Sequence, residues 1–339
     1  MEPHNAVAFV PPEPVNACSS FLCTKGLPYV LQCLFTFPFP SFPYPGSSGR
    51  EPPRHRNRIR QLKAVERDNI LARNNVRLVG PSDGPVLMLA QGFGCDQVVW
   101  HRILPFLQEC RLVLFDHAGT GGADISAYSA EKYSSLDGYL EDLTGILDAL
   151  DLREVTLVGH TVAGMMGIAA AAAGNARITR LALIGASACY RNIPGDRYAG
   201  GLSAGDIEKI LEAVTLNFPL WAAAMAPPMT GQAPGSVLAE ELTAAICRLH
   251  PEYVRDFLQL SLETDIRHLL PAVQIPVLLL QTPGDPLTPA AASRYLHENL
   301  ASSVLVHLNA KGNMPHVSAP RETAEAVLHY LFRSTHVLP

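Results

Sequence analysis

The sequence lacks several features that would place it in other classes of protein. Its 339 residues contain no apolar run that approaches the roughly 18 residues needed by a membrane-spanning helix. It also has no excess of positive charge, because 26 lysines and arginines stand against 31 aspartates and glutamates, for a net charge of −5. These absences argue against a membrane protein and against an electrostatic nucleic-acid binder.

Cysteine and histidine also fail to form the usual metal or disulfide patterns. The seven cysteines are odd in number and include no C-x-x-C, and no H-E-x-x-H motif is present. We interpret the cysteines as reduced thiols of an intracellular protein, in the cytoplasm, the nucleus or both. We predict neither a bound metal nor a cofactor.

The first 66 residues differ in composition from the rest of the chain. Eleven prolines fall here, and a basic run rich in arginine extends from Arg50 to Lys63. Because prolines at this density oppose a long helix or a central strand, residues 1–66 are predicted to be a disordered extension. An organelle transit peptide is the alternative, since no acidic residue falls between Glu13 and Glu51, but a Ser/Arg-rich amphipathic helix is missing.

From residue 67 to residue 335, short apolar runs mostly alternate with helical patterns. The runs span residues 75–78, 86–90, 112–115, 155–158, 181–184, 277–281 and 304–308. Residues 139–150 give an amphipathic helix that leads into the fourth run. This alternation predicts an α/β fold with a mostly parallel central sheet and helices on both of its faces.

Between residues 194 and 270 the strand pattern stops. Helical patterns over 204–218, 220–226 and 237–260 replace it, with a Pro/Gly-rich break at 226–231. A helical insertion at this place predicts a lid over the strand ends, where open α/β sheets bind their ligands. Helices that pack there without any gating role are the alternative.

The stretch from Thr156 to Met166 predicts a strand, a sharp turn and a helix in that order. Its centre reads G-H-T-V-A, with Thr161 in the middle and the small residues Gly159 and Ala163 two positions away on either side. A nucleophile elbow needs small residues at these two positions, because the strand and the helix come close together there. Thr161 supplies a hydroxyl, although its β-methyl restricts the side-chain rotamer.

Two further features complete a candidate acyl-transfer site. Asp285 follows an apolar run directly, where an orienting acid is expected, although an aspartate there is alternatively a turn residue. The backbone N–H groups of Phe93 and Val162 are the candidate oxyanion donors. A dinucleotide site is weaker, because Gln97 and Asp124 stand where the third glycine of G-x-G-x-x-G belongs.

Five blocks in order now resemble one branch of the α/β-hydrolases. They are Gly92–Gln97 with Trp100, Leu136–Tyr139, Val158–Val162, Ile184–Ser187 and Pro315–Pro320. Between about residues 69 and 331, the chain resembles the RsbQ branch, which includes the plant strigolactone and karrikin receptors. The resemblance implies an α/β-hydrolase fold, a four-helix lid, a deep apolar pocket and a Ser-Asp-His triad that slowly hydrolyses butenolides.

The resemblance also implies ligand contacts and partners. Phe93, His160, Trp221 and Met225 fall where such proteins line their pocket, although aromatic and Met side chains on helices more often pack in a core. Met225 stands in place of an aromatic residue, which would change the shape of the pocket. The plant receptors couple ligand handling to an F-box protein, so the lid is the expected partner surface.

The chain departs from this family at two triad positions. Thr161 replaces the serine and Asn313 replaces the histidine, so that only Asp285 remains. His316 matches a second family histidine, and its Cα is expected roughly 5 to 10 Å from the base position. Loss of one triad member typically lowers kcat by about 10⁴ to 10⁶, and an amide cannot take up the proton.

Two functions of different classes follow. The first is a regulator that binds a small apolar, butenolide-like ligand under its lid for signalling, with little or no ester hydrolysis. The alternative is a slow esterase with Thr161 as nucleophile, Asp285 as acid and His316 as a displaced base.

Overall fold

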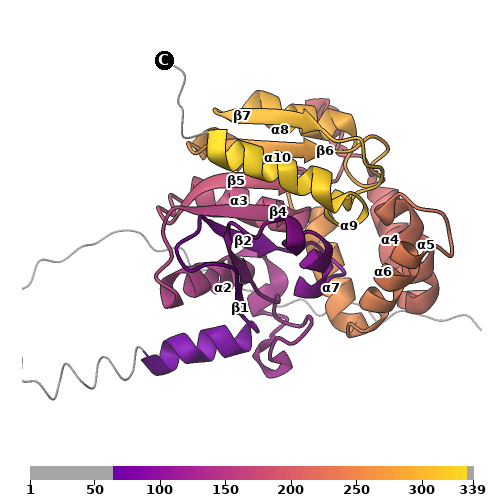
Figure 1. Cartoon of the computed structure of the whole chain (residues 1–339). Helices are drawn as coiled ribbons and strands as arrows, with labels where there is room; N and C mark the ends of the chain where they lie inside the picture. The colour runs from indigo at the N-terminus through magenta and orange to yellow at the C-terminus, as the bar shows by residue number, and fades with distance from the viewer. Residues whose placement is uncertain (1–63, 334–339) are drawn as a thin grey trace, which may run out of the picture. The chain divides into compact units, whose positions relative to one another are not determined.

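The structure, a computed structural model, describes residues 64–333 (Figure 1). The predicted extension lies outside this range apart from residues 64–66, so its disorder and the transit-peptide alternative stay predictions. Residues 64–73 are helical. Within residues 64–333, no helix is both long and apolar enough to cross a membrane.

Seven strands form one sheet, in agreement with the seven apolar runs. They are β1 (Arg77–Val79), β2 (Val86–Ala90), β3 (Arg111–Leu114), β4 (Val155–His160), β5 (Ile178–Ile184), β6 (Val277–Gln281) and β7 (Ser303–His307). Their order in space is β1-β3-β2-β4-β5-β6-β7. Only the pairing of β1 with β3 is antiparallel, which confirms the prediction of a mostly parallel sheet.

The sheet is buried on both faces, which explains why its strands are apolar throughout. In β4, Leu157 packs into one hydrophobic core and Val158 into the other, because successive side chains of a strand point to opposite faces. Helices α2 (Leu136–Ala149) and α3 (Val162–Ala172) cover the first face. Helix α10 (Pro320–Arg333) and the short helices η1 (Gln97–Arg102) and η2 (Leu104–Phe106) cover the second.

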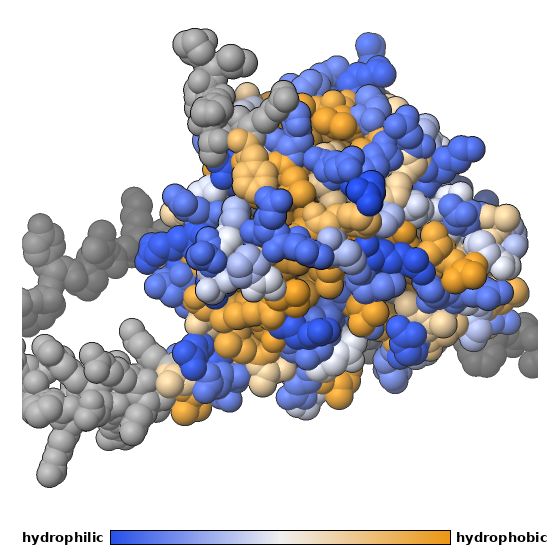
Figure 2. All heavy atoms as spheres, in the orientation of Figure 1, coloured by the Kyte–Doolittle hydropathy of each residue, from blue (hydrophilic) through white to orange (hydrophobic). Residues whose placement is uncertain are grey.

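The remaining elements include α8 (Ala290–Asn299), whose Leu296 packs into the first core, and several short helices. The short helices are η3 (Ile125–Ala127), η4 (Lys132–Ser134), η5 (Pro194–Asp196), η6 (Arg267–Ala272) and α9 (Pro315–Ser318). On the face of the molecule shown in Figure 2, hydrophobic and hydrophilic side chains are intermixed.

Four helices stand together at one end of the sheet (Figure 1). In the sequence they come between β5 and β6. They are α4 (Ala204–Leu216), α5 (Phe218–Thr230), α6 (Val237–Cys247) and α7 (Pro251–Glu263). A capping box between Ser203 and Asp206 starts α4, since each residue's side chain satisfies the other's backbone N–H. The helical insertion is therefore present, and its role as a lid stays a prediction.

Two predictions about these helices were wrong. Residues 237–260 form two helices, because Pro251 starts a new helix at a position that needs no N–H donor. Residues 226–231 do not break α5, which continues through Pro227 and Pro228 to Thr230. The helix ends instead at Gly231, which adopts a left-handed conformation with φ 67°.

Candidate functional site

Thr161 lies at the sharp turn between β4 and α3, in the strained backbone conformation of a nucleophile elbow. Its φ is 50° and its ψ is −115°, values that a β-branched residue very rarely adopts. The turn brings strand and helix so close that a Cβ atom at Gly159 would lie 2.8 Å from the carbonyl oxygen of Ala163. The structure thus shows why the position before the turn must be glycine.

The predicted oxyanion donors lie next to this turn. Val162 is the first residue of α3, where a helix leaves its N–H groups without intrahelical acceptors. Phe93 follows β2 in the loop whose Gly92 adjoins Thr161: a Cβ atom at Gly92 would collide with Thr161 Oγ1. Among the hydrogen bonds of residues 64–333, none has the Phe93 or Val162 amide as its donor. Their role as oxyanion donors stays a prediction.

Asp285 lies just beyond the end of β6, as expected. Its Oδ1 accepts hydrogen bonds from the backbone N–H groups of Leu287 and Thr288, both at 2.9 Å. Its Oδ2 accepts from Asn313 Nδ2 at 2.9 Å. Burial raises the pKa of Asp285 to about 6, and these hydrogen bonds oppose that rise. No cation pairs with this carboxylate in the part of the chain that the structure describes.

Asn313 fills the space between Asp285 and a histidine other than the expected one. It is fully buried, donates through Nδ2 to Asp285 and accepts at Oδ1 from His160 Nε2 at 2.8 Å. Because an amide oxygen only accepts, His160 must carry its proton on Nε2. The side chains of Asp285, Asn313 and His160 therefore form a chain of hydrogen bonds whose middle group is neutral and not basic.

The hydrogen bonds to Asn313 hold the His160 ring in place. Its Nε2 also contacts the carbonyl oxygen of Asn313 at 3.1 Å, and its Nδ1 has no hydrogen-bond partner among the described residues. Burial lowers the pKa of His160 to about 4, so the ring is neutral near pH 7. A Cβ atom at Gly92 would lie 2.6 Å from Nδ1, so this nitrogen and Thr161 Oγ1 both lie next to Gly92.

His316 lies in the core rather than at the acid. Its ring packs 4.5 Å from the ring of Trp100 and 4.7 Å from that of His160, measured between centroids. It is fully buried, and neither ring nitrogen has a hydrogen-bond partner within residues 64–333. Burial keeps the pKa of His316 well below its usual value. The structure therefore brings Thr161, Asp285 and Asn313 to one edge of the sheet without bringing the His316 ring to Asp285.

Two residues near the site were not expected from the sequence. Tyr190 is buried, and Asp285 and Thr161 are among the polar neighbours of its hydroxyl, which has no partner at hydrogen-bond distance in the described chain. The carbonyl oxygen of Met229, in α5, accepts from the backbone N–H groups of Asn313 and Met314 at 2.8 and 3.1 Å. No motif marks either residue, because both reach the site only through tertiary folding.

A cavity lies under the four helices, between them and the strand ends. Of the predicted ligand contacts, Phe93, Trp221 and Met225 line it, and the rings of Phe93 and Trp221 meet edge to face at 5.9 Å. His160 is not among its lining residues. The cavity measures about 40 Å³, which is room for one or two water molecules. A small ligand would need this space to enlarge.

No group of three or more His, Cys, Asp or Glu side chains in residues 64–333 is placed to hold a metal ion. The four cysteines in this range, Cys95, Cys110, Cys189 and Cys247, are free thiols. The absence of a metal and of a cofactor stays a prediction.

The parallel sheet, the strained elbow and the acid after β6 define the class of protein. The alpha/beta hydrolase family model matches residues 86–326, and the chain belongs to that family. Within it, the chain lies in the branch of the karrikin and strigolactone receptors, as two curated plant relatives show.

The similarity to these relatives extends over almost their whole length. The chain is 34% identical to Strigolactone esterase D14 of Arabidopsis thaliana over 264 residues, which cover 77% of this chain and 97% of that protein. It is 32% identical to Karrikin insensitive 2 receptor CA of Petunia hybrida, over 78% of this chain and 96% of that one. A solved hydrolase from Oleispira antarctica, olei00960, matches with a TM-score of 0.75, 31% identity and coverage of 78% and 97%.

Proposed function

We propose that this protein is a signalling receptor that binds a small apolar, butenolide-like ligand under its helical lid and hydrolyses esters little or not at all. Relatives named as karrikin and strigolactone proteins support the ligand class. The observation that carries the loss of catalysis is the bridge from Asp285 through Asn313 to His160. An imidazole at the bridging position would relay a proton, whereas the amide cannot accept one.

Ligand binding does not depend on the missing base. Affinity in such pockets comes mainly from apolar area and a few polar groups, and Phe93, Trp221 and Met225 supply apolar walls. Triad loss acts on the transition state, so we expect binding to survive where turnover fails.

A combined binding and turnover assay tests this function. Purified full-length protein is mixed with an aryl-substituted butenolide, and its melting temperature and the product are both measured. We expect the melting temperature to rise with ligand concentration, because a ligand of the folded state stabilises it by mass action. Product should not exceed that of a Thr161→Ala variant. Absence of any melting shift would contradict ligand binding. A yield of product well above that of the Thr161→Ala variant would contradict a receptor without hydrolysis.

One observation favours the slow esterase as a second function. Thr161 keeps the backbone strain of a nucleophile elbow, and the Phe93 and Val162 amides next to it are open to an oxyanion. In this alternative Asp285 remains the acid, and His316 would have to leave its packing against Trp100 to act as base. The same assay decides between the two functions.

The lid is the proposed surface for an F-box protein or another signalling partner. Leu216 and Leu220, on either side of the α4–α5 junction, have 77% and 65% of their surface exposed. Exposed leucines close together are suited to a protein contact that forms with the ligand. A Leu216→Glu, Leu220→Glu variant should lose capture of a purified F-box partner while keeping the ligand-induced melting shift. Unchanged capture would place the partner elsewhere.

A further inference from the structure

A second and larger hollow lies on the outer side of the cavity under the lid, between η1 and α6. It measures about 340 Å³, against about 40 Å³ for the inner cavity. Its apolar lining includes Cys95, Val98, Val99, Leu238, Ala244 and Ala245. Pockets for small ligands typically measure about 300 to 1,000 Å³. The outer hollow has this size and the inner cavity does not.

Two side chains separate the outer hollow from the inner cavity. Leu242 of α6 and Met314 of the loop after β7 line both spaces. Methionine changes rotamer at little energetic cost, since its side chain is unbranched and has three rotatable bonds. Movement of both side chains would join the two spaces.

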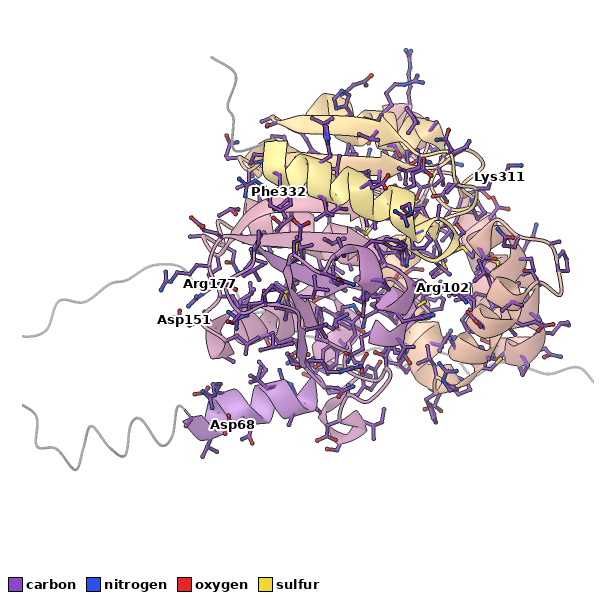
Figure 3. All side chains as sticks on the ribbon, in the orientation of Figure 1. Asp68, Arg102, Asp151, Arg177, Lys311 and Phe332 are labelled. Atoms are coloured by element: carbon purple, nitrogen blue, oxygen red, sulfur yellow. The ribbon has the colours of Figure 1, made fainter. Side chains whose placement is uncertain are left out.

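Two ion pairs cross from one wall of the hollow to the other. Arg102 at the end of η1 binds Glu241 of α6 at 2.7 Å, and Arg248 at the end of α6 lies 3.7 Å from Asp96 at the start of η1. Figure 3 shows Arg102 at the boundary between the sheet layers and the lid helices. Each pair joins a partly buried side chain, 32% exposed for Arg102 and 14% for Asp96, to a more exposed one, so both pairs would have to break for η1 and α6 to separate.

The charges around the hollow are paired with one another. The two ion pairs, Asp96–Arg248 and Glu241–Arg102, leave no excess charge of either sign at the rim. The Nδ1 atom of His101 bonds to the carbonyl oxygen of Val98 at 2.9 Å. Burial raises the pKa of Cys95 to about 12, so its thiol stays neutral. These surroundings favour a neutral, apolar molecule over an ion.

We propose that the hollow between η1 and α6 is the entrance and the outer half of the ligand site, which takes a small neutral apolar molecule and opens to the inner cavity past Leu242 and Met314. This inference rests on the proposed function for the existence of a ligand. It adds where the molecule enters and which two side chains it passes.

Methionine methyl groups report directly on the location of a bound molecule. Full-length protein labelled with ¹³C-methyl methionine is titrated with the neutral dye 1-aminoanthracene, and the Met314 signal is assigned with a Met314→Leu variant. We expect Met314 to shift first and furthest, ahead of Met225 and Met229, which line only the inner cavity. Ala245→Trp fills the outer hollow and should weaken binding at least about tenfold. Ala224→Trp, at an exposed alanine of α5, is the matched control and should leave binding unchanged.

Each contrary result overturns the proposal. Dye binding that survives Ala245→Trp, shifts at Met225 and Met229 without Met314, or no shift of Met314 at saturating dye would each exclude the outer hollow. The dye is unrelated to butenolides, so the two proposals can fail separately. A butenolide melting shift that persists in Ala245→Trp would keep the receptor and remove the entrance. Dye binding at Met314 without any butenolide-induced melting shift would keep the outer site and contradict the receptor function.

Discussion

At the residue scale, the bridge made by Asn313 explains how the site keeps its shape without its base. The amide donates to Asp285 and accepts from His160, so every polar atom of its side chain has a partner. A fully bonded buried amide is stable, because no desolvated group is left unpaired. The arrangement is therefore a structural network in which the Asn313 amide is fully bonded, while His160 Nδ1 has no hydrogen-bond partner among the described residues.

Restoring both replaced residues should restore hydrolysis. In a Thr161→Ser, Asn313→His double variant, the new imidazole would lie next to Asp285, where the base is expected. A positioned general base contributes about 10² to 10⁴ in rate. We expect hydrolysis of p-nitrophenyl acetate to rise at least about a hundredfold over the natural protein, and Thr161→Ser alone to stay near background. A folded double variant that remains inactive would show that the base position has been misplaced.

His316 is expected to lower stability rather than to act in chemistry. Both of its ring nitrogens are buried without partners in the described chain, and a buried unpaired polar group costs about 1 to 3 kcal/mol. His316→Leu should therefore raise the free energy of unfolding in urea by about that amount. Because the folded pKa lies below the unfolded one, the natural protein loses stability as the pH falls through about 6.5. The gain should be larger at pH 5.5 than at pH 8.

A matched control accompanies this measurement. His268 is exposed, so His268→Gln should change the free energy of unfolding far less than His316→Leu does. If His316→Leu destabilises the protein at both pH values, His316 has a polar partner in solution, and the catalytic alternative would gain support.

The sequence identified some of these residues and missed others for a physical reason. Asp285 and Asn313 could be located because each stands at a fixed offset from a strand or a motif. His160 was expected to contact ligand, but its ring points to Asn313, 153 positions away, where no local pattern can specify the contact. Tyr190 follows β5 and Met229 lies in α5, so both reach the site only through tertiary folding.

At the scale of elements, the end of α5 supports the loop that carries Asn313. The carbonyl oxygen of Met229 lies in the last turn of α5, where helical carbonyls lack intrahelical donors, and the amides of Asn313 and Met314 satisfy it. The chain then turns sharply at Gly231, where a Cβ atom would collide with the carbonyl oxygen of Lys311. The four-helix insertion and the loop that carries Asn313 are thus joined through one helix end.

A pair of glycine substitutions tests this junction. Gly231 and Gly235 both have positive φ, 67° and 78°, but nothing lies within 4 Å of a Cβ atom at Gly235. Gly235→Ala should cost only the backbone strain of about 1 kcal/mol. Gly231→Ala should cost about 1 to 3 kcal/mol more, because the Lys311 loop must also move. Equal losses in urea denaturation would show that the close contact between Gly231 and Lys311 does not exist.

The seven strands could be predicted because each is a short apolar run in a sheet that is buried on both faces. The continuation of α5 could not be predicted, since Pro227 and Pro228 normally end a helix. They remove the N–H groups that would bond the carbonyls of Ala223 and Ala224, and both alanines are exposed, so water can replace those bonds. Solvent exposure of one helix face, a tertiary property, overrides the local rule.

At the scale of the whole molecule, buried titratable groups oppose one another in their effect on stability. Burial lowers the pKa values of His117, His160 and His316, so the folded state loses stability as the pH falls through their unfolded value near 6.5. Burial raises the pKa of Asp285, so its contribution is fully present below about 4 and is lost as the pH rises through about 6. With three histidines against one aspartate, we expect net destabilisation by acid.

Asp285→Asn should separate the two effects. Removing the buried charge is expected to raise the free energy of unfolding by about 1 to 2 kcal/mol at pH 7.5 and to change it little below pH 4. Rotation of the Asn313 amide with a change of the His160 tautomer would preserve the hydrogen bonds between the three side chains and lose the contact of His160 Nε2 with the Asn313 carbonyl oxygen. Denaturation curves across pH 4 to 8 provide the measurement, and a loss of stability at pH 7.5 would mean that the carboxylate is paired with a cation in the folded protein.

The most direct test of the whole account is the hydrolysis rate of p-nitrophenyl acetate by the natural protein, divided by that of Thr161→Ala under the same conditions. With an amide where a base is needed, the threonine hydroxyl is not activated, and we predict a ratio of about one. A ratio of about ten or more, with both proteins folded, would show that Thr161 acts as a nucleophile and would contradict the account.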